Sequence, residues 1–370
     1  MKPIIYFIIS LLSLSSFSAP IKKSKEAQDL LKRLTHISLS FKKNQKILIG
    51  QQNAFIQGRG WNKYNADIDS ELKSDMFLAS GIHPSVHGID FLEIGDWNEA
   101  LIVNQVKRLH DLKGITTLTW HMKNLVNDNI GDGSSWDKSG QPVKKMLPGG
   151  SHHQLYKNEI RRLAKFLIKL KPAPVIFRPF HEHNDFWFWW GKSNSTKEEY
   201  LGLWNTLTSE LQKLGVDNLL YAYSPSYITN DYFERYPGDE VIDILGVDAY
   251  FKNVIRDTWF MGVDALGNWK KSVLWLMRAA EKRKKIPAIT EFGQESVNYE
   301  NFWTDYMGWP VEKAGISQLT NNLPNYGIAY VMLWRNDPND PKHFYGPIPG
   351  SVNQQNFLDL LSKGIFQGLF

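Results

Sequence analysis

The chain contains no cysteine, which excludes disulfide bonds and a lipid attached to an N-terminal cysteine. A strong excess of one charge is also missing, because 43 basic residues oppose 38 acidic ones and the formal net charge is only +5. The local basic clusters, IKKSK and EKRKK, are typical of a solvated chain start and a helix end. We therefore expect no nucleic-acid partner, and we expect stability to come from a large packed core, for which 370 residues suffice.

One apolar run stands out, at the start of the chain. In MKPIIYFIISLLSLSSFSAP a lysine precedes about a dozen apolar residues and small residues follow, which is the pattern of a secretory signal peptide. The run is shorter than the roughly 20 residues of a bilayer-spanning helix, so we expect no membrane anchor. We assign residues 1–18 as the signal peptide, because cleavage after Ser18 leaves Ser16 and Ser18 at the two small-residue positions. The mature protein is then periplasmic or secreted.

Short β-rich apolar runs recur along the rest of the chain. There are eight: KILIGQ, SVHGIDF, ITTLTWH, PVIFRPFHE, NLLYAYSP, DILGVDAY, IPAITEFG and IAYVMLWRN. Apolar residues at three- and four-residue intervals predict helices at 98–113, 156–171, 198–215 and 268–285. Strands that alternate with helices imply a parallel sheet. Without a low-complexity linker, eight units favour a single closed (β/α)₈ TIM barrel over residues 45–370, after a lead-in segment and helix at 19–44.

Longer polar stretches rich in glycine and proline follow three of the predicted strands. They lie at roughly 122–152, 251–268 and 298–318, and we expect them to be βα loops at the face where barrel enzymes build their sites. Polar side chains also end several strands, so they should converge on the same mouth.

Two of these strand ends are the glutamates Glu182 and Glu291, which a closed barrel brings together although they are distant in sequence. A pair of carboxyl groups flanking one bond is what glycoside hydrolysis requires, with one protonated and the other ionised. The alternative is that each glutamate pairs with an arginine, such as Arg178, in a structural network.

The stretch RPFHEHNDFWFWWG resembles the acid/base segment of glycoside hydrolase family 26, whose characteristic members are β-mannanases. ITEFGQE resembles the nucleophile segment of that family, and GIDF, TWH, LGVDAYF and MLWRN are similar to shorter motifs, so the resemblance extends from about residue 45 to 365. It implies a (β/α)₈ barrel and a retaining double displacement with Glu182 as general acid/base and Glu291 as nucleophile. Retention requires the two carboxyl groups to lie only about 5–5.5 Å apart.

The same resemblance implies a set of substrate-binding residues. His181 matches a residue that contacts the sugar near the scissile bond, and Tyr250 one that hydrogen-bonds the nucleophile. Trp187 and Trp334 match aromatic platforms for sugars, and His121 and Arg335 match residues that contact sugars on the glycone side. Arg178, four positions before Glu182, adds positive potential. The alternative for any one tryptophan is core packing. We expect core packing for four aromatic residues near Glu182, namely Phe186, Phe188, Trp189 and Trp190.

The resemblance implies β-mannan, galactomannan or glucomannan and manno-oligosaccharides as partners, with no cofactor. Fourteen tryptophans suit this reading, because stacked rings bind neutral sugars without formal charge. Two alternatives to internal cleavage stay open: exo-action that releases mannobiose, and a non-catalytic carbohydrate-binding barrel. Trp136 is either a distal sugar platform or a loop anchor. We expect a monomer.

Metal and serine chemistry are disfavoured. His152, His153, His181 and His183 gather near the expected mouth, but HEH lacks the HExxH spacing, so we expect no catalytic metal. No G-x-S-x-G elbow is present for a serine esterase. A regular strand through 181–183 would point Glu182 to the face opposite His181 and His183. The assignment of Glu182 as general acid/base therefore requires the strand to end at about His181 or to carry a bulge there.

Overall fold

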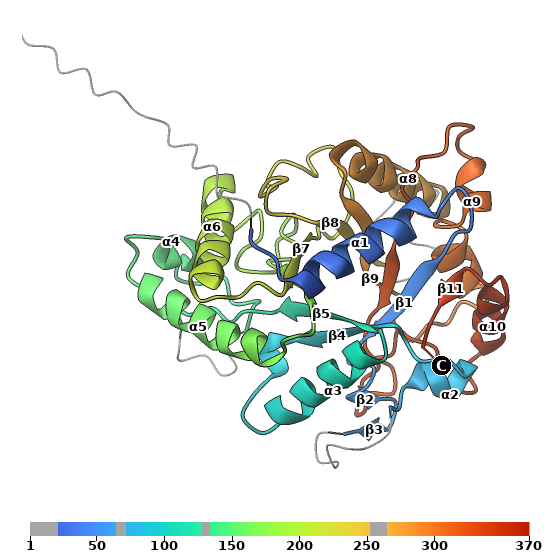
Figure 1. The fold of residues 1–370 in the computed structure, drawn as a ribbon, viewed down its shortest axis with the longest axis horizontal. Coiled ribbons are helices and arrows are strands. Elements are labelled where there is room, and N and C mark those ends of the chain that lie inside the picture. The colour runs from blue at the N-terminus through green and yellow to red at the C-terminus, as the bar shows by residue number, and fades with distance from the viewer. Residues whose placement is uncertain (1–20, 64–71, 128–133, 252–264, 370) are drawn as a thin grey trace, which may run out of the picture.

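A computed structural model describes residues 21–63, 72–127, 134–251 and 265–369. The predicted signal peptide, residues 1–18, lies outside these ranges. Eight parallel strands form a ring in which β1 pairs with both β4 and β10 (Figure 1). They are β1 (Ile47–Gln52), β4 (Val86–Asp90), β5 (Ile115–Trp120), β6 (Val175–Pro179), β7 (Leu219–Tyr223), β8 (Ile244–Tyr250), β9 (Ile286–Gly293) and β10 (Tyr330–Leu333). The predicted single (β/α)₈ TIM barrel is confirmed, and each of the eight apolar runs coincides with one strand to within a few residues.

The long helices match the segments with helical spacing to within a few residues. They are α3 (Glu99–Asp111), α5 (His153–Lys169), α6 (Lys197–Lys213) and α8 (Ala265–Arg283). Thr196 and Glu199 form a reciprocal capping box that fixes the start of α6. None of the helices in the described ranges is long and apolar enough to cross a lipid bilayer.

Several short elements were not predicted, because two to nine residues are too few for a periodic signal. They are α2 (Asp75–Ser80), α4 (Pro142–Met146), α9 (Lys313–Ser317), α10 (Gln354–Ser362), η1 (Phe91–Glu93), η2 (Trp303–Gly308), β2 (Gln57–Gly58), β3 (Trp61–Asn62) and β11 (Phe366–Gln367). Three of the predicted loops therefore carry helix: 122–152 contains α4, 298–318 contains η2 and α9, and 251–268 overlaps the start of α8. Parts of two loops, 128–133 and 252–264, lie outside the described residues.

Helix α1 (Lys25–Leu39) falls within the lead-in segment and lies across the strands in Figure 1. Ser24 caps its N-terminus by accepting from the amide of Ala27. Its apolar face, with Leu30, Leu34 and Ile37, packs against inward-facing strand residues. Each fully buried leucine or isoleucine contributes roughly 1.5–3 kcal/mol of burial free energy. The helix thus closes the end of the barrel where the strands begin.

Inward-facing positions change from apolar to polar along the strands. On β6, Ile176 belongs to the apolar interior and Arg178 follows it on the same face. On β8, Ile244 is apolar, whereas Asp248 and Tyr250 come later on that face. Because all strands are parallel, these polar side chains meet at the barrel end formed by their C-termini.

Candidate active site

Glu182 lies on a turn beyond β6, because the strand ends at Pro179, two residues earlier than required by the sequence argument. Phe180 and Glu182 have positive φ angles of 50° and 52°, and the amide of Glu182 donates to the carbonyl of Ser224 at 2.7 Å. Strand alternation therefore does not apply to Glu182. Left-handed backbone costs a non-glycine residue about 1–3 kcal/mol and persists where neighbouring structure holds it, as in active sites.

A β-bulge in β9 directs Glu291 into the barrel. Ile289 and Phe292 both face the outer core although they are three positions apart, and the register with the neighbouring strands shifts between them. The extra residue lets Thr290 and Glu291 both face inward, where Thr290 contacts Asp248 and Glu291 contacts Tyr250. Without the bulge, one of these two side chains would point away from the mouth.

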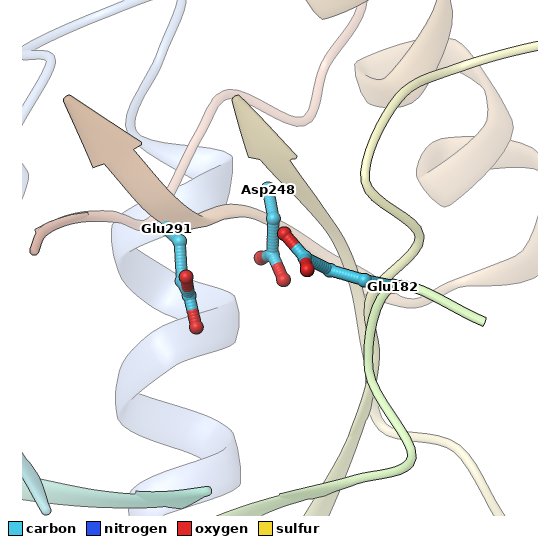
Figure 2. A group of neighbouring side chains, drawn as sticks. All are labelled: Glu182, Asp248 and Glu291. Atoms are coloured by element: carbon cyan, nitrogen blue, oxygen red, sulfur yellow. The ribbon is translucent and has the colours of Figure 1, made fainter. Parts of the chain in front are cut away.

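The barrel mouth brings together three carboxyl groups, those of Glu182, Asp248 and Glu291. Oxygen atoms of all three lie within 4.8 Å of one another. Figure 2 shows Asp248 and Glu291 at the ends of adjacent strands and Glu182 approaching from its loop. Such close carboxylates cannot all be ionised without strong repulsion, so the site holds at least one proton near neutral pH.

Hydrogen-bond donors indicate which carboxyl group carries that proton. Glu291 accepts from Nη2 of Arg178 at one oxygen and from the hydroxyl of Tyr250 at the other, at 2.5 Å. Among the described residues, Glu182 accepts only from the indole N–H of Trp187, at 2.8 Å. Donors stabilise a carboxylate, so Glu291 is the ionised group and Glu182 the protonated one.

The local electrostatics agree with this division. Burial raises the pKa of Glu182 well above its usual range, and the charges of Glu291 and Asp248 raise it further. Burial likewise raises the pKa of Tyr250 well above 10, with a further contribution from Glu291, so the phenol remains a donor. Burial disfavours the charge of Arg178, but Asp248 and Glu291 outweigh this and hold its pKa above the usual value.

Asp248 completes the ion-pair network. Its Oδ2 accepts from Nη1 of Arg178 at 2.6 Å, and its Oδ1 accepts from the hydroxyls of Ser224 at 2.8 Å and Thr290 at 2.7 Å. Burial raises the pKa of Asp248 to about 7, and Arg178 acts in the opposite direction. The arginine network that we considered as an alternative to catalysis thus exists, and it lies within the candidate site.

His181 and His121 form a second polar chain. Nε2 of His181 lies 3.1 Å from Nε2 of His121, and Nδ1 of His121 contacts a carboxylate oxygen of Asp90. Burial opposes the charge of His121, but Asp90 outweighs burial and raises its pKa. Burial, and then Arg178, lower the pKa of His181 well below 6.5. His121 is therefore the donor and neutral His181 the acceptor.

The aromatic residues after Glu182 divide into a buried and an exposed group. Phe188, Trp189 and Trp190 are buried, as predicted. The prediction was wrong for Phe186, which is 58% exposed. The exposed side chain of Lys138 lies over its ring and donates to its carbonyl, and a contact from one flexible side chain leaves most of the ring accessible.

Half-buried Trp187 lies beside Trp136, with ring centroids 6.5 Å apart and planes 29° from parallel. Trp136 is 59% exposed, so it adds open aromatic surface next to Trp187. Trp334 follows β10 on its inward face, with its ring 6.2 Å from that of His121. Arg335 pairs with Glu93 at 2.6 Å rather than with either catalytic candidate.

A metal site would have to use the carboxylates. Among the described residues, Glu182, Asp248 and Glu291 are the group close enough to share an ion. Their oxygens already accept protein donors, and Arg178 provides positive charge between Asp248 and Glu291. Three of the four histidines considered are placed elsewhere: His152 and His153 begin α5, and His183 packs between the rings of Tyr200 and Tyr223, whereas His181 contacts His121.

Sequence reasoning did not assign roles to Asp248, Asp90, Ser224 and Thr290. Asp248 was detectable, because it stands two positions before Tyr250 and therefore shares its inward face. Ser224 and Thr290 carried no signal, since their roles depend on the turn after β7 and the bulge in β9.

Known proteins resemble the chain in sequence. A family model described as glycosyl hydrolase family 26 matches residues 20–325. A mannan endo-1,4-beta-mannosidase of Bifidobacterium adolescentis is 32% identical over 238 residues, 61% of this chain and 23% of that protein. The mannan endo-1,4-beta-mannosidase of Bacillus subtilis strain 168 is 38% identical over 221 residues, 55% of this chain and 60% of that protein. The matched part thus spans less than two thirds of either relative.

Solved structures resemble the chain over nearly its whole length. A GH26 beta-mannanase from Bacteroides ovatus has a TM-score of 0.78 and 29% identity, covering 94% of this chain and 96% of that one. The catalytic domain of a GH26 endo-beta-1,4-mannanase from a Bacillus species has a TM-score of 0.79 and 26% identity, with coverage of 95% and 93%.

Proposed function

Because the chain belongs to glycosyl hydrolase family 26, we propose that it is a retaining endo-β-1,4-mannanase that uses Glu182 as general acid/base and Glu291 as nucleophile. The observation that supports the mechanism most strongly is the approach of the carboxyl oxygens to within 4.8 Å. Inverting enzymes separate their carboxyl groups by roughly 6.5–9.5 Å to admit a water between them. The spacing here instead suits direct attack on the sugar.

In the first step, an oxygen of Glu291 attacks the anomeric carbon while the bond from that carbon to the leaving oxygen breaks. The proton of Glu182 passes to the leaving oxygen, so the departing sugar chain leaves as a neutral alcohol. In the second step, Glu182 removes a proton from water, and the water oxygen displaces Glu291 from the anomeric carbon. Two inversions restore the starting configuration and both starting protonation states.

The surrounding residues support these roles. Arg178 and Tyr250 donate to separate oxygens of Glu291, which keeps it ionised and limits its rotation. Trp187 orients Glu182 through its N–H, and its ring offers an apolar face beside the acid for the leaving sugar.

The substrate proposal follows the printed names of the relatives, mannan endo-1,4-beta-mannosidases and GH26 beta-mannanases. We infer action on mannan, galactomannan or glucomannan. Time-resolved product analysis tests internal cleavage: an early ladder of mixed oligosaccharides is expected, whereas mannobiose alone from the first minutes would indicate exo-action.

Proton NMR of the first product from a manno-oligosaccharide tests the mechanism. We expect the β-anomer to appear first and the α-anomer to follow by mutarotation. Glu182→Ala and Glu291→Ala should each abolish release of reducing ends, while Glu300→Ala, at an exposed position, should not. A wild-type protein that binds mannan without cleaving it would instead support the non-catalytic alternative.

Export and a monomeric state belong to the same proposal. Fractionation of cells that express the full chain should find the protein outside the cytoplasm and shortened after Ser18. Light scattering coupled to size-exclusion chromatography should give a mass close to that of one chain.

A further inference from the structure

Asp248 is the third carboxylate in the barrel mouth, and the proposed reaction does not use it directly. Figure 2 shows its side chain at the end of β8, next to Glu291 on the neighbouring strand and to the carboxylate of Glu182. The side chain is 0% exposed. A buried carboxylate of this kind acts through the groups that it contacts.

The contacts of Asp248 form a built anion site. Both hydroxyl donors and the guanidinium of Arg178 point at its oxygens, and each of them favours the ionised form. Gly246 makes the arrangement possible, because a Cβ at that position would lie 2.5 Å from Oγ1 of Thr290. The bulge in β9 provides the inward orientation of Thr290.

Arg178 connects this anion to the nucleophile, through Nη1 to Asp248 and through Nη2 to Glu291. When Glu291 bonds to the sugar it loses its charge, and its contact with Arg178 loses its ionic character. A buried guanidinium without an ionic partner is strongly unfavourable. The ion pair with Asp248 remains in that state, because the neutral, bonded Glu291 no longer contributes to raising the pKa of Asp248, and Arg178 still favours its ionised form.

We propose that Asp248 is a positioning residue that aims Arg178 at Glu291 and remains its counter-ion after Glu291 has bonded to the sugar. This inference rests on the proposed retaining mechanism. The charged and titratable groups that face the cluster from the packed elements are Glu182, Glu291, Arg178, His121, His181, Tyr232, Tyr250 and Tyr330. Among these, Arg178 is the permanent cation.

Asp248→Asn tests the proposal, because it removes the charge and keeps the shape. Asp243→Asn is the matched control. Asp243 directly precedes β8 and is also buried. Its carboxylate pairs with Lys23 at 3.2 Å and accepts a hydrogen bond from the amide of Tyr221 at 2.9 Å. Asp243 lies at the opposite end of β8 from Asp248, so removing its charge should affect stability and not the reaction.

Two readouts separate catalysis from stability. The kcat/KM for a dinitrophenyl β-mannobioside, whose leaving group needs no proton, reports formation of the covalent intermediate. Asp248→Asn should lower it on the order of 100-fold, through loss of a hydrogen-bonded ion pair beside the reacting carboxylate. On a manno-oligosaccharide, the alkaline limb of the kcat/KM profile should move down by about one pH unit, because the negative charge that favours protonated Glu182 is gone. Asp243→Asn should change neither quantity.

If Asp248→Asn lowers the Tm while both readouts match the wild type, Asp248 is only a structural ion pair and the inference is wrong. Should that variant fail to fold by circular dichroism, Thr290→Val removes one donor to Asp248 with little change of shape. Thr290→Val should lower kcat/KM about tenfold and move the alkaline limb of the pH profile downward, as expected for Asp248→Asn. Unchanged values of both quantities would overturn the inference. Inversion by the wild type would refute the proposed function itself, whereas retention with an unaffected Asp248→Asn would refute only the role of Asp248.

Discussion

Replacing Trp187 by phenylalanine separates two contributions of this side chain. Phenylalanine keeps an aromatic face for the sugar but removes the indole N–H that donates to Oε2 of Glu182 at 2.8 Å. Burial is the largest influence on the pKa of Glu182 and raises it, whereas this hydrogen bond acts in the opposite direction. Trp187→Phe should therefore raise the pKa of Glu182 still further.

The size of the change follows from the energy of the lost hydrogen bond. A hydrogen bond to a charged group is worth about 1.5–3 kcal/mol, and one pKa unit corresponds to about 1.4 kcal/mol. Trp187 is half-buried, so water replaces part of the lost donation and the lower end of this range applies. We expect an upward shift of about one unit.

The assay is the pH dependence of kcat/KM on a manno-oligosaccharide. The alkaline limb should move about one unit upward, opposite to the change expected for Asp248→Asn, and KM should stay close to the wild-type value. Trp187→Ala should move the limb equally and also raise KM, because it removes the ring. A limb that stays in place or moves downward in Trp187→Phe would refute Glu182 as the group that must be protonated.

Three further changes test other parts of the structure. Tyr250→Phe removes a donor to Glu291 and should lower kcat/KM by about 10- to 100-fold with little change in Tm, as measured by steady-state kinetics and thermal melting. Asp90→Asn removes the charge that raises the pKa of His121, so NMR titration of the His121 ring should show a lower pKa, and an unchanged value would contradict the pairing. Leu34→Ala, at a fully buried position of α1, should lower the free energy of unfolding by about 2–5 kcal/mol in urea denaturation and leave the pH profile unchanged.

The fold was predictable because its signals are local and repeated. Each strand has an apolar run, and each long helix has an apolar stripe, so chain order alone indicated the barrel. The strand order also predicted that Glu182 and Glu291 lie near one another. Glu182 follows β6 and Glu291 lies near the C-terminal end of β9, and both strands belong to one parallel ring.

The irregular backbone of the site was not predictable. Glu182 reaches the mouth through a turn with positive φ, and Glu291 through a bulge, and neither feature has a periodic pattern. Asp248 was expected at the mouth, because it ends the same apolar run as Tyr250, but its contacts with Arg178, Ser224 and Thr290 could not be predicted. Phe186 was expected to be buried with its aromatic neighbours, but burial of a loop residue depends on what packs over it, which the sequence does not encode locally.

The most direct test of the two-carboxylate mechanism is mass spectrometry of the protein after reaction with a 2-deoxy-2-fluoro-mannosyl inactivator, which slows release of the sugar from the enzyme. One sugar per chain should be attached, and peptide sequencing should locate it on Glu291. Attachment to Glu182 or Asp248, or turnover that yields the α-anomer first with no attached sugar, would contradict the proposed mechanism.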